Sequence, residues 1–218
     1  CDCDEDEYYL TYGGESYGIE PLSTNDSVED FYNYIDSVGS DATNSSANKN
    51  IQKEDTSVVF LYEDDGGNLS LVFVHDENTS DDGGAASVTV EGAPGDVNPW
   101  IQDDGEWQVK DDAEGSESSG FEDYEDWKVD WAWGSDRTDG GAIGDLGGDF
   151  AIRVDLSVND NAARYDNSIA DGDIDELVVL SGGAGFGEDS EVISLEDGLS
   201  ESESVEELII HSACGIES

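Results

Sequence analysis

The three cysteines carry the most specific chemistry in this sequence. Cys1 and Cys3 lie in the opening CDCDEDE, and Cys214 lies near the other end of the chain. We predict a disulfide between Cys214 and one N-terminal cysteine, because closing so long a loop stabilises by about 5 kcal/mol in the chain-entropy model. The remaining thiol can carry a lipid on Cys1, bond to another subunit or stay free. The alternative is a Cys3His zinc set with His211, although its spacing matches no known finger.

An array of acidic residues offers oxygen ligands for calcium. The segment DGDIDE places Asp171, Asp173 and Asp175 at alternate positions, as at the start of a calcium-binding loop. An EF-hand needs glycine at the sixth position and glutamate at the twelfth, but Glu176 and Gly182 stand there. The EF-hand interpretation therefore fails, and a looser Ca²⁺ site in a loop of a sandwich remains the prediction.

Two further features concern the surface. Four N-x-S/T sequons predict glycosylation on an outer face, at Asn25, Asn44, Asn68 and Asn78. Alternation along WKVDWAW places Trp127, Trp131 and Trp133 on one face of a strand. They are either an exposed platform for sugars or subunits, or core residues in a chain with few large aliphatic side chains. We favour the core interpretation.

Catalytic motifs are absent from the sequence. No G-x-S-x-G, H-E-x-x-H or phosphate-loop pattern stands in a suitable setting, and the chain contains only two histidines. We therefore expect that the protein is not an enzyme.

The charge limits the environment and the partners of the chain. Its 218 residues include 56 Asp and Glu against 7 Lys and Arg, for a formal net charge of -49. Such self-repulsion opposes a compact state in dilute buffer. At molar salt the Debye length falls to about 3 Å, so we interpret the chain as adapted to high salt. The charge favours cations as partners and excludes electrostatic binding to nucleic acid or anionic lipid.

The apolar pattern predicts a chain that is mainly β. The segment FAIRVDLSV alternates apolar and polar residues, which indicates a strand with one buried face in an antiparallel sheet. The segment SVVFLYEDDGGNLSLVFVHD reads as a hairpin. The segment SVEELIIHSAC is either a C-terminal strand, which we favour, or a short helix with a capping box of Ser204 and Glu207. With roughly nine or ten short strands at this spacing, we expect residues 1–218 to form a single antiparallel β-sandwich or jelly-roll domain.

Three segments near the N-terminus complete this prediction. Residues 1–14 contain a strand that can be exchanged between subunits. Residues 26–39 form the one short helix, with an apolar face that includes Val28 and Phe31, and with Asp26 or Ser27 as its cap. Residues 40–57 are a polar linker or a long surface loop.

The chain resembles a class of secreted proteins. The segments LSLVFVHDENTSDDGGAASVTVEG and VDWAWGSDRTDGGAIGDLGGDF are similar to the acidic, Asp- and Gly-rich β domains of haloarchaeal surface proteins. A chain that starts with cysteine and lacks methionine also suggests processing after export, and no apolar run reaches the ~18 residues of a membrane span. We therefore expect an extracellular or cell-surface location, with a membrane contact only through a lipid on Cys1.

The expected function follows from export, a β fold and the absence of catalytic motifs. We expect a structural subunit of an extracellular filament, sheath or surface layer, a homopolymer assembled by strand complementation or other subunit contacts. The alternatives are a monomeric lipid-anchored module that binds carbohydrate or cations, and a viral surface or capsid subunit.

Overall fold

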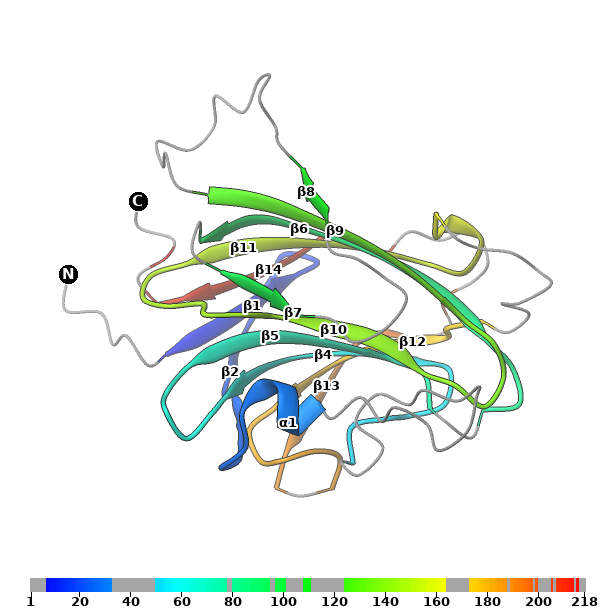
Figure 1. Cartoon of the computed structure of the whole chain (residues 1–218), viewed down its shortest axis with the longest axis horizontal. Helices are drawn as coiled ribbons and strands as arrows, with labels where there is room; N and C mark the ends of the chain where they lie inside the picture. The colour runs from blue at the N-terminus through cyan, green and yellow to red at the C-terminus, as the bar shows by residue number, and fades with distance from the viewer. Residues whose placement is uncertain are drawn as a thin grey trace.

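The mainly β fold is confirmed. The computed structural model describes residues 7–32, 50–77, 80–94, 97–100, 108–110, 124–163, 173–187, 189–197, 199, 205, 207–213 and 215. Two sheets lie face to face, and one short helix, α1, lies outside them (Figure 1). A single apolar cluster contains inward-facing residues of both sheets, such as Leu71 of one and Val154 of the other.

The first sheet is antiparallel, with strand order β2-β1-β14-β11-β6-β9-β8. Its strands are β1 (Tyr8–Tyr12), β2 (Glu15–Ile19), β6 (Gly84–Pro94), β8 (Gln108–Lys110), β9 (Tyr124–Trp133), β11 (Ala151–Val158) and β14 (Leu208–Ser212). The strand predicted from FAIRVDLSV is β11, which alternates buried and more exposed residues as expected. The C-terminal strand is β14, so this prediction is also confirmed.

The second sheet has strand order β13-β12-β4-β5-β10-β7, and β3 pairs with β4 outside this path. Its strands are β3 (Leu22–Ser23), β4 (Thr56–Glu63), β5 (Leu69–His75), β7 (Asn98–Trp100), β10 (Asp139–Gly144), β12 (Glu176–Ser181) and β13 (Glu191–Asp197). The sheet is mixed, which corrects the purely antiparallel expectation. Its parallel pairs are β12–β4 and β3–β4. A parallel pair needs a long connection, and between β4 and β12 the chain crosses both sheets.

The second sheet is buried on both faces over β4 and β5, which form the predicted hairpin. Val59 and Phe73 face the first sheet, whereas Val58 and Val72 belong to a second apolar cluster on the outer face. Burial on both faces explains why these strands read as continuous apolar runs instead of an alternation. The short 3₁₀ helix Asn159–Asn161 follows β11 on the way back to this sheet.

The helix α1 (Val28–Tyr32) covers the outer face. Phe31 is fully buried and stacks on Tyr62 of β4, with 4.2 Å between ring centroids. Ser27 caps the helix, because its Oγ accepts a hydrogen bond of 3.2 Å from the Asp30 amide. The predicted helix 26–39 is thus found over Val28–Tyr32, and residues 33–39 lie outside the described residues.

The predicted linker 40–57 ends earlier than residue 57 in the structure. Residues 40–49 lie outside the described residues, but Ile51 is fully buried in the outer cluster and β4 already begins at Thr56. A single apolar residue in a polar stretch shows no period, so Ile51 could not reveal this packing.

The predicted N-terminal strand lies at β1 within its own sheet. It pairs with β14 on one side and with β2 on the other.

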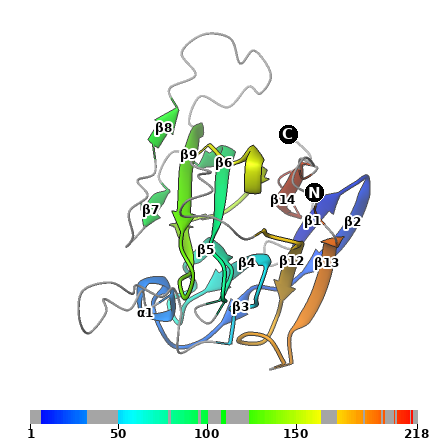
Figure 2. The ribbon, with the colours of Figure 1, turned by 90° about the vertical axis from the view of Figure 1, so that its right-hand side faces the viewer.

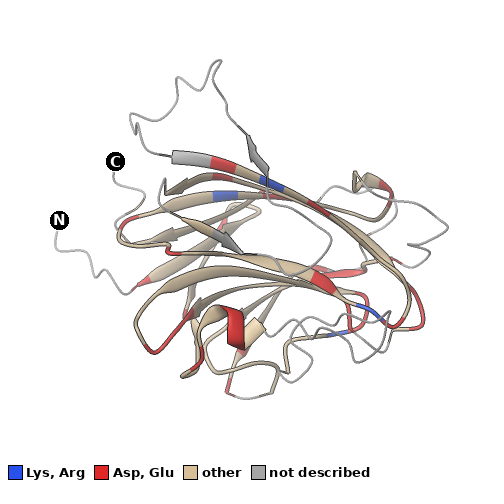
Figure 3. Cartoon of the chain, in the orientation of Figure 1, with Lys and Arg blue, Asp and Glu red and all other residues tan. Residues whose placement is uncertain are grey.

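The acidic residues of the described segments lie mostly in turns and at strand ends, whereas the sheets carry few charges (Figure 3).

Candidate functional site

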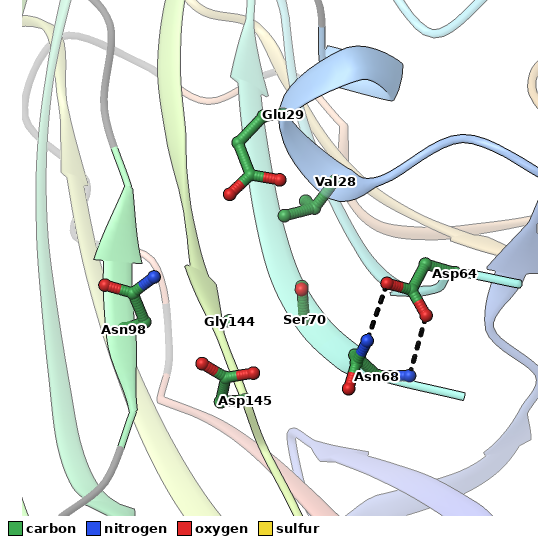
Figure 4. Close-up of a pocket in the computed structure, with 8 residues that line it drawn as sticks. All are labelled: Val28, Glu29, Asp64, Asn68, Ser70, Asn98, Gly144 and Asp145. Carbon is green, nitrogen blue, oxygen red and sulfur yellow. Dashed lines mark hydrogen bonds between the residues drawn. The ribbon is translucent and has the colours of Figure 1, made fainter. Parts of the chain in front are cut away.

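A polar pocket of about 140 Å³ lies at one end of the outer face of the second sheet (Figure 4). Five segments supply its walls, so the fold builds it from residues distant in the sequence. The lining residues are Val28 and Glu29 of α1, Asp64 and Asn68 of the β4–β5 turn, Ser70 of β5, Asn98 of β7, and Gly144 and Asp145 at the end of β10.

The hairpin turn holds the carboxylate of Asp64 in one position. Asp64 Oδ1 accepts hydrogen bonds from the Gly66 amide at 2.8 Å and the Asn68 amide at 2.9 Å. Its Oδ2 accepts a third from Asn68 Nδ2 at 2.7 Å. These donors, the Asn68 side chain first, lower the pKa of Asp64. Gly67 takes a φ of 79°, the positive value expected for this Asp-Gly-Gly-Asn turn.

Ser70 and Gly144 form the floor of the pocket. Ser70 is only 2% exposed, and its hydroxyl has no hydrogen-bond partner among the described residues. Gly144 lies beside it on β10, where a Cβ atom would approach Ser70 Oγ to 3.4 Å. The missing side chain at Gly144 therefore leaves the Ser70 hydroxyl open to the pocket.

The pocket is strongly anionic. Glu29, Asp64 and Asp145 contribute three carboxylates, and none of the described lining residues is basic. Asp145 has a φ of 63°, in the left-handed region that aspartate tolerates better than most residues. A concave site lined by one sign of charge concentrates counter-ions, so this arrangement attracts cations.

At the opposite end of β5, a buried polar network joins the two sheets. A hydrogen bond of 2.8 Å joins His75 Nδ1 and Ser57 Oγ, and the His75 ring stacks on Trp133 at 5.7 Å. Trp133 Nε1 donates to Asp76 Oδ2 at 3.0 Å. Burial lowers the pKa of His75 from 6.5 to about 3, so the ring is neutral in the folded protein. Its role is structural, because it lies inside the core.

Acidic loops surround this end of the sandwich. Burial and the charge of Asp76 raise the pKa of Asp55 to about 6. Burial, which is the larger cause, and the charge of Asp175 raise the pKa of Asp173. The carboxylates are therefore close enough to repel one another, which is the condition in which protons or bound cations stabilise a fold.

The predicted calcium array lies partly within these loops. Asp171 is outside the described residues, whereas Asp173 and Asp175 are exposed, and the Asp175 amide donates to the Asp55 carbonyl at 2.7 Å. Over the described parts of the chain, no three Asp, Glu, His or Cys side chains come close enough to hold one metal ion. The calcium site at this array stays a prediction.

The predicted cysteine sites also stay predictions, because Cys1, Cys3 and Cys214 lie outside the described residues. The Ala213 amide donates to the Glu7 carbonyl at 2.8 Å, so the chain segments that lead to these cysteines meet at β1 and β14. His211, the proposed zinc ligand, is buried and stacks on Tyr9.

Two of the four sequons lie in the described structure. Asn25 and Asn68 are exposed, whereas Asn44 and Asn78 are outside it. Asn68 also lines the pocket, where its Nδ2 donates to Asp64. The structure therefore places one predicted glycosylation site at the rim of the candidate site.

The core interpretation of the tryptophans is confirmed. Trp127, Trp131 and Trp133 are all less than 9% exposed and belong to the apolar cluster between the sheets. They therefore do not form an exposed sugar platform.

Sequence reasoning missed most of the pocket. It singled out Asn68 as a sequon, Val28 on the helix and the hairpin as a whole, but not Glu29, Asn98 or Asp145. One signal was present: Ser70 interrupts the apolar run LSLVFVH, in a strand that is buried on both faces.

The comparisons with known proteins find no relative. No protein-family model matches the chain, and neither the curated proteins nor the solved structures contain a significant match. None of the described helices is long and apolar enough to cross a membrane.

Proposed function

We propose that this chain is a structural subunit of an extracellular filament, sheath or surface layer that assembles in high salt, and that it is not an enzyme. The observation that supports this most directly is the open edge of the second sheet at β13. In the described part of the chain, β13 pairs only with β12. Val192 of β13 is 46% exposed, and it is the one large apolar side chain among the described residues with such exposure.

An open edge strand is a template for pairing with another chain. The β13 strand is seven residues long and lies beside β12, below the β1–β2 hairpin at the right of Figure 2. A hydrogen bond from the Tyr12 hydroxyl to Glu196 joins this hairpin to β13. One edge of each sheet is thus presented on the same side of the molecule, which gives a partner strand a broad surface.

Charge makes such pairing dependent on salt. The exposed residues of β13 include Glu191, and β2 presents Glu15. Like charges at an edge oppose pairing between copies in dilute buffer. At molar salt the Debye length of about 3 Å removes most of this repulsion. We therefore expect assembly in brine and dissociation in dilute buffer.

Edge pairing at β13 is favoured over exchange of the N-terminal strand. Because β1 has neighbours on both sides, its departure would break the β1–β14 and β1–β2 ladders. Addition of a strand to β13 breaks no ladder. The assembly contact proposed from this geometry is therefore pairing of β13 with a second copy of the chain.

The test is sedimentation velocity in 3 M and 0.2 M KCl, with negative-stain microscopy of the high-salt sample. We expect polymers in high salt for the wild-type protein. Val192→Glu places a charge on the open edge and should reduce assembly at least tenfold. Ala163→Glu is the matched control, since Ala163 is exposed beyond β11 and gains the same charge.

Two results contradict this proposal. A wild-type protein that stays monomeric in 3 M KCl would exclude self-assembly, and equal losses in Val192→Glu and Ala163→Glu would exclude β13 as the contact. A ladder on a non-reducing gel would show in addition that cysteines lock the assembly.

A further inference from the structure

We propose that the pocket between α1, the β4–β5 turn and the end of β10 binds one hydrated divalent cation, with Mg²⁺ as the best chemical match. This inference goes beyond the structural role proposed above and does not depend on it.

The lining has the chemistry of a site for hard cations. Its polar groups are the carboxylates of Glu29, Asp64 and Asp145, together with a serine hydroxyl and two asparagine side chains. Oxygen atoms of these kinds are the ligands that Mg²⁺ and Ca²⁺ prefer, whereas zinc prefers nitrogen and sulfur. Glu29 and Asp145 face the space in Figure 4, and the hydrogen bonds of the turn involve Asp64 and not these two carboxylates.

Ser70 is an independent indication of a ligand. The residue is only 2% exposed on the outer face of β5, and within the described structure its hydroxyl forms no hydrogen bond. Ser70 lines the pocket, so its hydroxyl is free to hydrogen-bond to whatever fills that space. In Figure 4 the Ser70 hydroxyl points toward the space below Glu29, so a water molecule or ion in the pocket would satisfy it.

Gly144 keeps this hydroxyl accessible. A Cβ at Gly144 would lie 3.4 Å from Ser70 Oγ and 3.6 Å from the Asn98 carbonyl oxygen, which are ordinary contact distances. Alanine therefore fits at this position without strain, but it fills the floor of the pocket. Gly144→Ala should therefore block the site and leave the fold intact.

The size of the pocket and the spacing of its carboxylates favour an ion that keeps water. The volume of about 140 Å³ is well above the roughly 10–15 Å³ that one water needs, so it holds an ion together with water. Within the described residues no three acidic side chains converge on one point, so direct ligation by all three carboxylates is excluded. Mg²⁺ gives up its water reluctantly and is commonly held through one or two carboxylates.

A cation here would tie together segments that the backbone leaves separate. Glu29 belongs to α1, Asp64 to the hairpin turn and Asp145 to the connection between β10 and β11. Without a cation these carboxylates repel one another, and with one they share a counter-charge. Binding should therefore stabilise the folded chain in proportion to occupancy.

The test is thermal unfolding against MgCl₂ in 2 M KCl, after removal of divalent ions, because high KCl suppresses diffuse counter-ion binding. We expect a saturable rise in Tm for the wild-type protein. Gly144→Ala and Asp145→Asn should weaken the apparent affinity at least tenfold. Asn tolerates the left-handed backbone of Asp145, so Asp145→Asn changes charge with little strain.

Asp155→Asn is the matched control, since Asp155 is exposed on β11 and its loss removes the same charge. Its affinity for Mg²⁺ should equal that of the wild-type protein. Ser70→Ala should shift the Tm little without Mg²⁺, because the hydroxyl makes no hydrogen bond within the described structure, and should weaken Mg²⁺ binding.

Three results would overturn the proposal: no saturable rise in Tm, equal losses in Asp145→Asn and Asp155→Asn, or an unchanged affinity in Gly144→Ala with a native circular dichroism spectrum. Tighter binding of Ca²⁺ than of Mg²⁺ would overturn the hydrated mode, because it would indicate direct ligation in a larger and more flexible site.

Discussion

Protonation of His75 should destabilise the fold in mildly acidic buffer. The ring is fully buried between the sheets and stacks on Trp133, which leaves a charged imidazolium without solvent. Its pKa is about 3 in the folded chain, against about 6.5 in an unfolded chain. Between these two values the unfolded state binds more protons, so stability falls as the pH falls.

The size of the effect follows from this difference. Lowering the pH from 6.5 to 4.5 should reduce the free energy of unfolding by about 2 kcal/mol through His75 alone, since one pKa unit corresponds to about 1.4 kcal/mol. His75→Gln does not titrate, and its amide can still form a hydrogen bond with Ser57. The variant should therefore lose about 2 kcal/mol less than the wild-type protein over this range.

The assay is urea unfolding in 3 M KCl at pH 6.5, 5.5 and 4.5 for both proteins. Carboxylates with raised pKa values change the free energy of unfolding in the opposite direction. The main one is Asp55: because its pKa is about 6, the folded chain gains stability as Asp55 is protonated. They are present in both proteins, so the difference isolates His75. Parallel pH dependences of the two proteins would refute the reasoning, because they would mean that His75 is solvated or already charged.

Three further predictions concern packing and charge. Gly84→Ala should lower the free energy of unfolding by about 1–3 kcal/mol, because its Cβ would lie 2.4 Å from the Trp133 ring. Gly144→Ala should change it little, and urea unfolding of both variants measures the difference. Trp131→Ala should cost about 3–5 kcal/mol in the same assay, since Trp131 is fully buried. Dialysis from 3 M to 0.1 M KCl should lower the Tm of the wild-type protein in a thermal melt, because screening of its net charge of -49 is lost. An unchanged Tm would contradict the interpretation of the chain as adapted to salt.

The alternation and length of apolar runs were enough to predict a mainly β chain, its hairpin and its C-terminal strand. Local patterns carry this information because the side chains of a strand alternate between faces, and because Asp and Gly favour the tight turn. The helix cap at Ser27 was predictable for the same reason, since it depends only on neighbouring residues.

Contacts between distant segments could not be read in this way. The parallel pairing of β12 with β4 joins residues more than a hundred positions apart, and no local pattern specifies such a partner. The burial of Ile51 likewise depends on an apolar cluster that forms only after β4, β5 and β12 come together.

The pocket shows most clearly the difference between what local sequence predicts and what packing decides. Among 56 acidic residues, nothing in the sequence distinguishes Glu29 and Asp145 from the others. They become neighbours because α1 packs on the outer face of the second sheet, next to the end of β10. Composition could therefore predict that this chain attracts cations, but the place where carboxylates gather around a buried hydroxyl follows from packing, which acts across the whole chain.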